Sequence, residues 1–311
     1  MREGRSLNSK LLERLPKRVT VVEVGPRDGL QNEKFEVPAA VKLKFISALA
    51  TSGLRIIEAT SFVDPRWVPQ LSDAEQVLAG LDLSGEVRYP VLVPNEKGYE
   101  RAIAHGAKEV SIFASATESF SQKNLNRSRD EAIEMFRPVA ERASNDSVRV
   151  RAYLSMVLGD PWEGDVPITA VADAAIKLMD LGCEELSLGD TIGVGTPGKV
   201  QDLIAGIVRA GIDVSRLAVH FHDTYGQGLA NVLAALETGV SVVDSSAAGL
   251  GGCPFAKSAT GNLATEDLIW MLDGLGIETG VDVNKVADAG AQICRAMGKD
   301  IPGRAARALT S

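Results

Sequence analysis

Cysteine is scarce in this chain, and its few cysteines lie far apart. Only three of the 311 residues are cysteines, namely Cys183, Cys253 and Cys294. An odd and widely spaced set matches neither a disulfide framework nor the paired spacing of a structural zinc site. The sequence therefore predicts free thiols in a reducing compartment.

Long apolar runs and an excess of positive charge are also missing. The polar, basic segment 1–17 lacks the apolar core of a secretory signal, no run is long enough to span a bilayer, and residues 308–311 form no peroxisomal or retention signal. The net charge is −8, which gives nucleic acid and anionic membranes no attraction to the protein as a whole. We therefore expect a cytoplasmic protein that binds neither, although a local basic pocket for an anionic metabolite stays open.

Short β-branched segments alternate with longer helical patterns along the chain. The predicted strands are residues 19–24, 54–59, 87–93, 109–113, 148–155, 184–188, 217–222 and 242–246. The helices after them are 39–51, 73–80, 96–105, 129–144, 167–181, 198–210, 228–238 and 265–275, with one more at 283–297. Repeated strand-then-helix order forces parallel pairing through right-handed crossovers. Eight such units predict a closed TIM (β/α)8 barrel rather than an open doubly wound sheet.

The chain shows no linker or shift in composition that would separate two domains. We expect one catalytic barrel domain over residues 19–311, with an additional C-terminal helix. Residues 1–18 are predicted to be an N-terminal extension. Chemistry in such a barrel takes place where strands end and the following loops begin, so polar residues at those points are the candidates for a site.

Two of the three histidines, His220 and His222, lie on the seventh predicted strand. Residues two apart on a strand point to the same face, so the two rings could hold one metal ion. Asp28 ends the first strand, next to the seventh and eighth around a closed ring, and Asn262 could add an amide oxygen. This nitrogen and oxygen set suits Mg²⁺ or Mn²⁺, and zinc is less favoured unless Cys253 serves as a ligand. The competing interpretation is a pair of hydrogen-bonded polar residues that line the barrel.

A glycine-dense loop at 249–254 carries Cys253 after the eighth strand. Glycines permit close backbone approach and loop movement, so this thiol could be a nucleophile or a general acid. The alternative is a small packing residue, a common role for cysteine. Cys183 and Cys294 are interpreted as core residues.

A glycine pattern at 193–198 matches the letters of a dinucleotide fingerprint but not its context. The fingerprint follows the first strand of an open sheet, whereas this segment follows the sixth predicted strand and contains Pro197. A tight loop that opens a helix is the better interpretation.

Four segments together resemble 3-hydroxy-3-methylglutaryl-CoA lyases. They are residues 22–33 (VEVGPRDGLQNE), 187–193 (SLGDTIG), 220–227 (HFHDTYGQ) and 249–267 (GLGGCPFAKSATGNLATED). The resemblance extends roughly from residue 16 to residue 297. The Arg–Asp opening and the histidine pair also occur in a wider metal-dependent group, which includes isopropylmalate and homocitrate synthases and carboxyltransferase domains. The loop with Cys253 is the signal specific to the lyases.

The resemblance implies a role for each matching residue. Asp28, His220, His222 and Asn262 would bind the metal, and Arg27 would hold the thioester carbonyl and the developing enolate. Cys253 would be the catalytic thiol, and Glu58 and Asp190 would be carboxylates of the active site. The pocket would be lined by Ser61, Tyr153, Ser187 and Thr191.

The reaction implied is the retro-Claisen cleavage of 3-hydroxy-3-methylglutaryl-CoA to acetyl-CoA and acetoacetate, a step of leucine degradation and ketone-body metabolism. Its general base is either Asp190 or His220, and the sequence does not separate the two. The expected partners are an acyl-CoA thioester and a second copy of the chain in a homodimer.

Three positions depart from the family pattern. Phe221 and Asp160 stand where cysteine is common, and Phe255 stands where tyrosine is common. Position 221 should point away from the metal, but the other two could alter the pocket and leave open a lyase for a longer, branched acyl chain. A forward Claisen synthase is disfavoured because such enzymes carry long additional domains. A non-catalytic scaffold is disfavoured because no candidate ligand has been lost.

Overall fold

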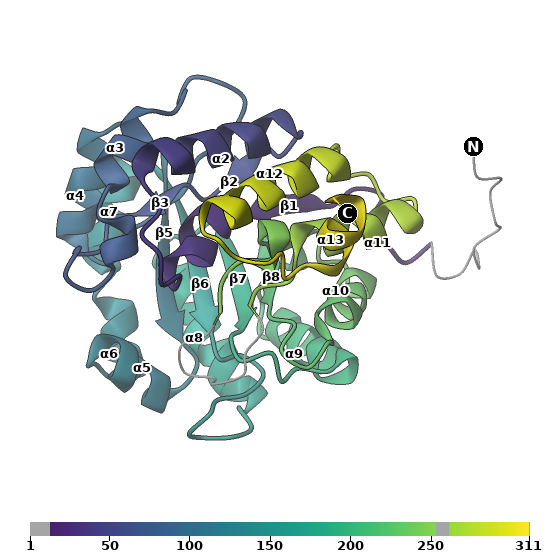
Figure 1. Cartoon of the computed structure of the whole chain (residues 1–311). Helices are drawn as coiled ribbons and strands as arrows, with labels where there is room; N and C mark the ends of the chain where they lie inside the picture. Colours follow the sequence, from purple (N-terminus) through teal and green to yellow (C-terminus); the bar gives the residue numbers. More distant parts are fainter. Residues whose placement is uncertain (1–12, 253–260, 311) are drawn as a thin grey trace.

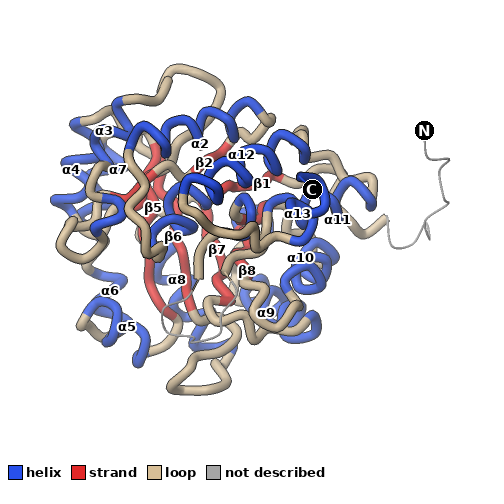
Figure 2. Tube along the Cα trace, in the orientation of Figure 1, coloured by secondary structure: helices blue, strands red, loops and turns tan. Residues whose placement is uncertain are grey.

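The computed structural model describes residues 13–252 and 261–310. Its strands form one parallel sheet that curls inside a layer of helices (Figures 1 and 2). The strands are β1 (Thr20–Glu23), β2 (Ile56–Ile57), β3 (Thr60–Ser61), β4 (Val91–Leu92), β5 (Glu109–Ser115), β6 (Arg149–Ser155), β7 (Glu185–Asp190), β8 (Leu217–Phe221) and β9 (Val242–Ser245).

The sheet closes into a ring because β2 and β3 are two pieces of one barrel strand. The first piece pairs with β1 and the second pairs with β4. Between them, the amide of Glu58 donates to the carbonyl of Glu23 on one side, and the amide of Ala59 donates to Pro90 on the other. β1 also pairs with β9, so the predicted eight-stranded TIM barrel is confirmed.

The helices lie around the barrel (Figure 1). They are α2 (Ala39–Thr51), α3 (Ala74–Ala79), α4 (Glu96–Ala104), α5 (Glu118–Leu125), α6 (Arg129–Glu134), α7 (Arg137–Asn145), α8 (Ile168–Asp180), α9 (Pro197–Arg209), α10 (Gly228–Glu237), α11 (Thr265–Gly274), α12 (Val283–Ala296) and α13 (Arg304–Thr310). Among the described residues, no helix combines the length and the apolar character needed to cross a membrane.

Besides the division of the second predicted strand into β2 and β3, the structure differs from the predicted elements in several places. The single helix predicted over 129–144 is two helices, α6 and α7, and Pro138 lies in the first turn of α7, where a missing N–H is tolerated. The strand predicted over 87–93 shrinks to Val91–Leu92, between two prolines that cannot donate to a ladder. Helices α5 and α13 were not predicted, because neither has a clear apolar stripe in the sequence.

The two faces of the barrel strands differ in character. On β6, Val150, Ala152 and Leu154 belong to the main apolar core between the sheet and the helices. The alternate residue Arg151 crosses the barrel interior to reach Asp244 on β9. Successive strand residues point to opposite faces, so the outer face is apolar while much of the inner face is polar. A small apolar cluster of Val22, Val24 and Ile56 with Val242 fills the inner face around β1.

Candidate metal centre and substrate cavity

A tight turn after β1 presents Arg27 and Asp28 to the barrel mouth. The turn is a five-residue π-helix, Gly25–Gly29, and the amides of Arg27, Asp28 and Gly29 all donate to the carbonyl of Val24. Gly29 has to be glycine here because a Cβ would lie 2.8 Å from the Ser246 hydroxyl. Single π-turns are frequent at functional sites, and this one anchors the first candidate residues against the end of β9.

Asp28, His220 and His222 form a compact cluster at this mouth. Each offers one ligand atom, and these atoms lie within 4.8 Å of one another. His220 Nε2 is 3.9 Å from Asp28 Oδ2, and the amide nitrogen of Asn262 donates to the same oxygen at 2.8 Å. The structure therefore brings together all four residues that were predicted to bind a metal.

The chemical state of the cluster suits a divalent cation. His222 Nδ1 and Asn262 Oδ1 are buried and have no hydrogen-bond partner among the described residues, which is rare for buried polar atoms. Burial and the neighbouring His220 lower the pKa of His222 to about 4, so its ring is neutral and able to ligate. Burial alone would raise the pKa of Asp28, but Arg27 and His220 lower it to about 2 and keep the carboxylate charged. A neutral imidazole, as at His222, and an ionised carboxylate, as at Asp28, are forms that bind metals.

Arg27 is a fixed, buried cation beside this cluster. Its Nε donates to Glu58 at 2.5 Å and its Nη1 donates to Asp28 at 2.6 Å. The guanidinium also lies 5.2 Å from the centre of the Tyr153 ring. Burial opposes the charge, but Glu58 and Asp28 outweigh it and raise the pKa of Arg27 above its ordinary value. The side chain therefore presents a positive charge whose orientation is set before any ligand arrives.

Beneath the histidines lies a buried group that the sequence analysis missed. Asp244 on β9 accepts hydrogen bonds from Arg151, from the hydroxyl of Ser187 at 2.7 Å and from His220 Nδ1 at 3.3 Å. Burial opposes ionisation, but Arg151 and His220 lower the pKa of Asp244 to about 2. A signal was present in the sequence, because charged residues interrupt the apolar strands at Arg151 and Asp244. The meaning of this pattern depends on the strand register, which brings Arg151 and Asp244 into contact.

Asp190, the last residue of β7, lies opposite Phe221 and not opposite a histidine in the register of β7 and β8. Its two oxygens accept the backbone amides of Val194 at 3.1 Å and Gly195 at 2.8 Å. Burial outweighs these bonds and raises its pKa to about 6. Asp190 is not among the described residues that line the cavity, and the glycine-rich loop that resembled a nucleotide fingerprint is the segment that it holds.

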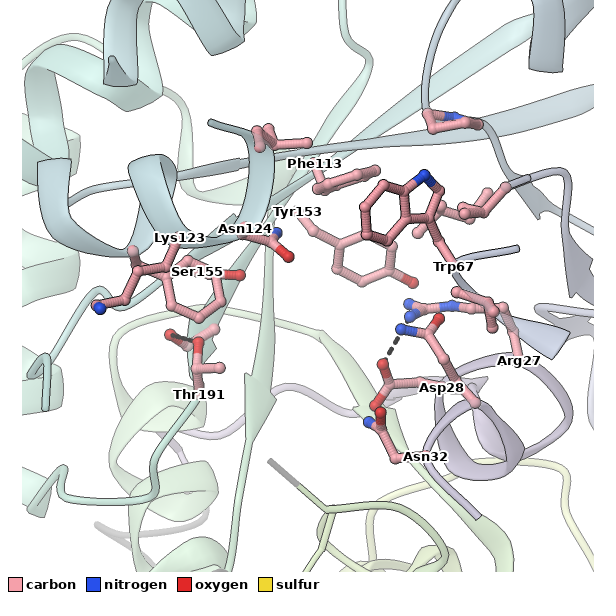
Figure 3. Close-up of a pocket in the computed structure, with 18 of the residues that line it drawn as sticks. Arg27, Asp28, Asn32, Trp67, Phe113, Lys123, Asn124, Tyr153, Ser155 and Thr191 are labelled. Carbon is pink, nitrogen blue, oxygen red and sulfur yellow. Dashed lines mark hydrogen bonds and ion pairs between the residues drawn. The ribbon is translucent and has the colours of Figure 1, made fainter. Parts of the chain in front are cut away.

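A cavity of about 850 Å³ opens from the cluster to the surface (Figure 3). Its inner end is lined by Arg27, Asp28, His220 and His222. The rest of its lining includes Trp67, Phe113, Phe120, Lys123, Arg127, Tyr153 and Thr191. In Figure 3, Tyr153 lies between Arg27 and Asp28 on one side of the view and Lys123 on the other. The cavity therefore combines aromatic side chains with charged groups, among them Lys123 and Arg127 as well as the cluster.

The remaining predicted site residues lie in different places. Ser61 accepts the amide of Val63 and, like Glu58 and Ser187, is not among the described residues that line the cavity. The Tyr153 hydroxyl is buried without a partner among the described residues, and the hydroxyl of Thr191 accepts the amide of Met156.

The loop with Cys253 and the three departures from the family pattern lie partly within the described residues. Cys253 and Phe255 lie outside the described residues, but Gly252, directly before Cys253, lines the cavity. Phe221 packs in the apolar core and points away from the histidines, as predicted. Asp160 is buried and accepts a hydrogen bond from the Thr117 hydroxyl at 2.6 Å.

Comparisons with known proteins agree with this arrangement. A family model described as HMGL-like matches residues 18–293. The mitochondrial hydroxymethylglutaryl-CoA lyase of Rattus norvegicus is 55% identical over 304 residues, which cover 98% of this chain and 93% of the rat protein. The crystal structure of hydroxymethylglutaryl-CoA lyase from Pseudomonas aeruginosa is similar with a TM-score of 0.93 at 52% identity, covering 95% of this chain and 98% of that one.

A further similar structure is an HMG-CoA lyase from Acinetobacter baumannii in complex with coenzyme A and 3-methylmalate. It has a TM-score of 0.89 at 34% identity and covers 94% of this chain and 95% of its own.

Proposed function

Since the chain belongs to the hydroxymethylglutaryl-CoA lyase family, carbon–carbon lyases that cleave 3-hydroxy-3-methylglutaryl-CoA to acetyl-CoA and acetoacetate, we propose how its own residues carry out this cleavage. The observation that carries the proposal is the position of the buried Arg27 cation beside Asp28 and the histidine pair, at the inner end of one cavity.

Asp28, His220, His222 and Asn262 would hold the divalent cation on which this family depends, and we propose Mg²⁺ or Mn²⁺ from the oxygen and nitrogen donors. When bound, such an ion polarises the oxygen atoms of a substrate and lowers the pKa of a hydroxyl group. Asn262 turns its amide nitrogen toward Asp28, and rotation of the amide would bring the oxygen into that place.

Arg27 would stabilise the enolate of acetyl-CoA as the carbon–carbon bond breaks. Its ion pairs with Glu58 and Asp28 fix the guanidinium, so little reorganisation is needed when negative charge develops on the thioester oxygen. A preorganised donor of this kind is typically worth about 3 kcal/mol of transition-state stabilisation. Glu58 acts through Arg27 and therefore positions it.

The structure bears on the choice between the two candidate bases. His220 lines the cavity, whereas both carboxylate oxygens of Asp190 accept hydrogen bonds from backbone amides of the loop that follows it. We propose that Asp190 holds the loop and that His220 accepts the hydroxyl proton. Nε2 has one lone pair, so during this proton transfer His220 would not be a metal ligand and the cation would be held by Asp28, His222 and Asn262.

Cys253 is proposed to donate the proton that converts the enolate carbon to the methyl group of acetyl-CoA. Two observations support access of the Cys253 thiol to the substrate. The preceding residue, Gly252, lines the cavity, and the Asn32 side chain donates a hydrogen bond to the Gly252 carbonyl at 2.9 Å. Cys253→Ala should lower kcat by orders of magnitude with the fold intact. Cys294→Ala, which alters a buried cysteine on α12, is the matched control; equal kcat in both variants would reduce Cys253 to a packing residue.

We propose that the coenzyme A part of the substrate leaves the cavity past Lys123 and Arg127. These two cations line its outer part although the chain as a whole is acidic, and coenzyme A carries several phosphate charges. Replacing both with glutamine should raise KM for the full thioester several-fold and leave KM for the corresponding pantetheine thioester unchanged. Lys199→Gln, at a cation paired with Asp165, is the control, and equal effects on both thioesters would contradict the assignment.

A product assay tests the function as a whole. The protein is incubated with 3-hydroxy-3-methylglutaryl-CoA and Mg²⁺ or Mn²⁺, and acetoacetate and acetyl-CoA are quantified. Equal amounts of the two products are expected. Failure with this substrate, together with turnover of a longer branched 3-hydroxyglutaryl-CoA, would assign the lyase to a different acyl chain. Condensation of acetyl-CoA with a 2-oxo acid would indicate a synthase instead.

Location and assembly are also proposals. We propose a cytoplasmic homodimer, although the rat relative is described as mitochondrial. Cell fractionation and light scattering of the purified protein test the two statements separately.

A further inference from the structure

Asp244 is a buried carboxylate for which the proposed cleavage has no chemical use. It is 1% exposed and lies at the level of His220 on the adjacent strand. Neither Asp244 nor Arg151 is among the described residues that line the cavity, so neither would touch the substrate. A buried ion pair is costly unless further hydrogen bonds satisfy it, so its contacts call for an explanation.

The donors around Asp244 determine which nitrogen of His220 carries the proton. Arg151 donates to the two oxygens at 2.6 and 3.2 Å, and Ser187 donates to Oδ2 at 2.7 Å. An ionised carboxylate can only accept, so the remaining contact, from His220 Nδ1 at 3.3 Å, requires a proton on Nδ1. In the neutral ring the lone pair of Nε2 then lies on the side of Asp28, whose Oδ2 is 3.9 Å away.

Arg151 links this carboxylate to the rest of the inner face. Its guanidinium lies 4.9 Å from the centre of the Tyr153 ring, and the Arg27 guanidinium lies 5.2 Å from the same ring. Tyr153 and His220 in turn meet edge to face, with centroids 6.0 Å apart. The ring plane of His220 is therefore held by Asp244 through a hydrogen bond and by Tyr153 through packing.

We propose that Asp244, held by Arg151, is a positioning residue that fixes the tautomer and the ring orientation of His220, so that Nε2 faces the cavity with a free lone pair. Nε2 needs this lone pair whether it binds a metal ion or accepts a proton. The proposal rests on the proposed function for the use made of the lone pair, whereas the hydrogen bonds that fix the tautomer do not depend on that function. Outer partners of this kind typically change metal affinity 10–100-fold when they are removed.

The first test needs no variant and no substrate. In metal-free protein labelled with ¹⁵N at histidine, in alkaline buffer where the rings are neutral, two-bond ¹⁵N–¹H correlations report the tautomer of His220. The expected result is a proton on Nδ1 and a lone pair on Nε2. The opposite tautomer would overturn the proposal.

The second test compares two buried carboxylates that each bind an arginine. Asp244→Asn can present an amide N–H to His220 and force the opposite tautomer, so Mn²⁺ affinity measured by calorimetry should fall 10–100-fold. Glu109→Gln is the control, because Glu109 pairs with Arg88 at 2.6 and 2.8 Å and is likewise almost fully buried. It should lower the melting temperature but leave Mn²⁺ affinity unchanged.

The outcomes separate this proposal from the proposed function. Unchanged Mn²⁺ affinity in folded Asp244→Asn would make Asp244 and Arg151 a structural ion pair only. If that variant does not fold, the tautomer of the unmodified protein still decides. A protein with the expected tautomer and Mn²⁺ affinity but no lyase activity would contradict the function and leave the role of Asp244 standing.

Discussion

The two faces of the barrel strands follow opposite rules. On β7, Leu186 and Leu188 point outward into the apolar core, while Ser187 between them points inward and donates to Asp244. The outer face packs against helices and holds the fold through burial of apolar area. The inner face buries the charges of Arg27, Glu58, Arg151 and Asp244, each of which needs a partner. Stability and chemistry are thus assigned to alternate residues of the same strands.

Removal of the metal should have the largest effect and should act on the inner face alone. Exhaustive chelation is expected to abolish turnover, and Mg²⁺ or Mn²⁺ should restore it. The circular dichroism spectrum should change little, because the apolar core outside the barrel does not depend on the cation. Full activity after chelation would remove the metal from the mechanism.

Arg27→Gln should come next. Loss of the fixed cation is expected to lower kcat/KM about 10²–10³-fold, mostly through kcat, because the lost interaction belongs to the transition state. Arg27→Lys is the matched control: it keeps a charge for Glu58 and Asp28 but not the planar fork, and should lie in between. A change confined to KM would mean that Arg27 only holds the ground state.

Leu186→Ala tests the outer face one residue away from an inward-pointing side chain. A buried leucine truncated to alanine typically costs about 2–5 kcal/mol of unfolding free energy, and Leu186 is fully buried. Chemical denaturation should show this loss, while kcat per folded molecule should not change. A fall in kcat comparable to that of Arg27→Gln would break the division between the two faces.

Glu23 is an exception on the outer face, and it gives the smallest predicted effect. Its carboxylate accepts the amides of Gly25 and Ala247 and the hydroxyl of Thr265. Burial raises the pKa of Glu23 to about 7, because its effect outweighs that of these hydrogen bonds, which lower the pKa. A raised pKa means that the folded state keeps a proton that the unfolded chain loses above about pH 4.3. This contribution to stability is therefore present at low pH and is lost as the pH rises toward 7.

Glu23→Gln isolates that contribution. A glutamine oxygen can accept both amides, and its amide group can donate to Thr265, so the fold should be kept. The difference in unfolding free energy between the variant and the unmodified protein should shift in favour of the variant by up to about 3 kcal/mol from pH 4.5 to pH 8. A difference that does not vary with pH would show that Glu23 is charged throughout.

The alternation of strands and helices was sufficient to predict the barrel, because β-branched runs and helical periodicity are local properties. The histidine pair could likewise be predicted, since residues two apart on a strand share a face. Asp244 and Arg151 could not be, because their meaning depends on which strands face each other across the ring. The restraint on Asp190 was also invisible, since it comes from the conformation of the loop that follows it.

The closing of the ring also sets when the protein can fold during its synthesis. The hydrogen bond from Asn262 to Asp28 joins residues 234 positions apart, and β1 pairs with β9. At typical translation rates of about 5–20 residues per second, Asp28 leaves the ribosome on the order of tens of seconds before Asn262 is made. The nascent first strand has to wait for its last neighbour over that time. Asp28 and Asn262 come from these two ends of the chain, so the proposed metal site can be completed only after the ring has closed.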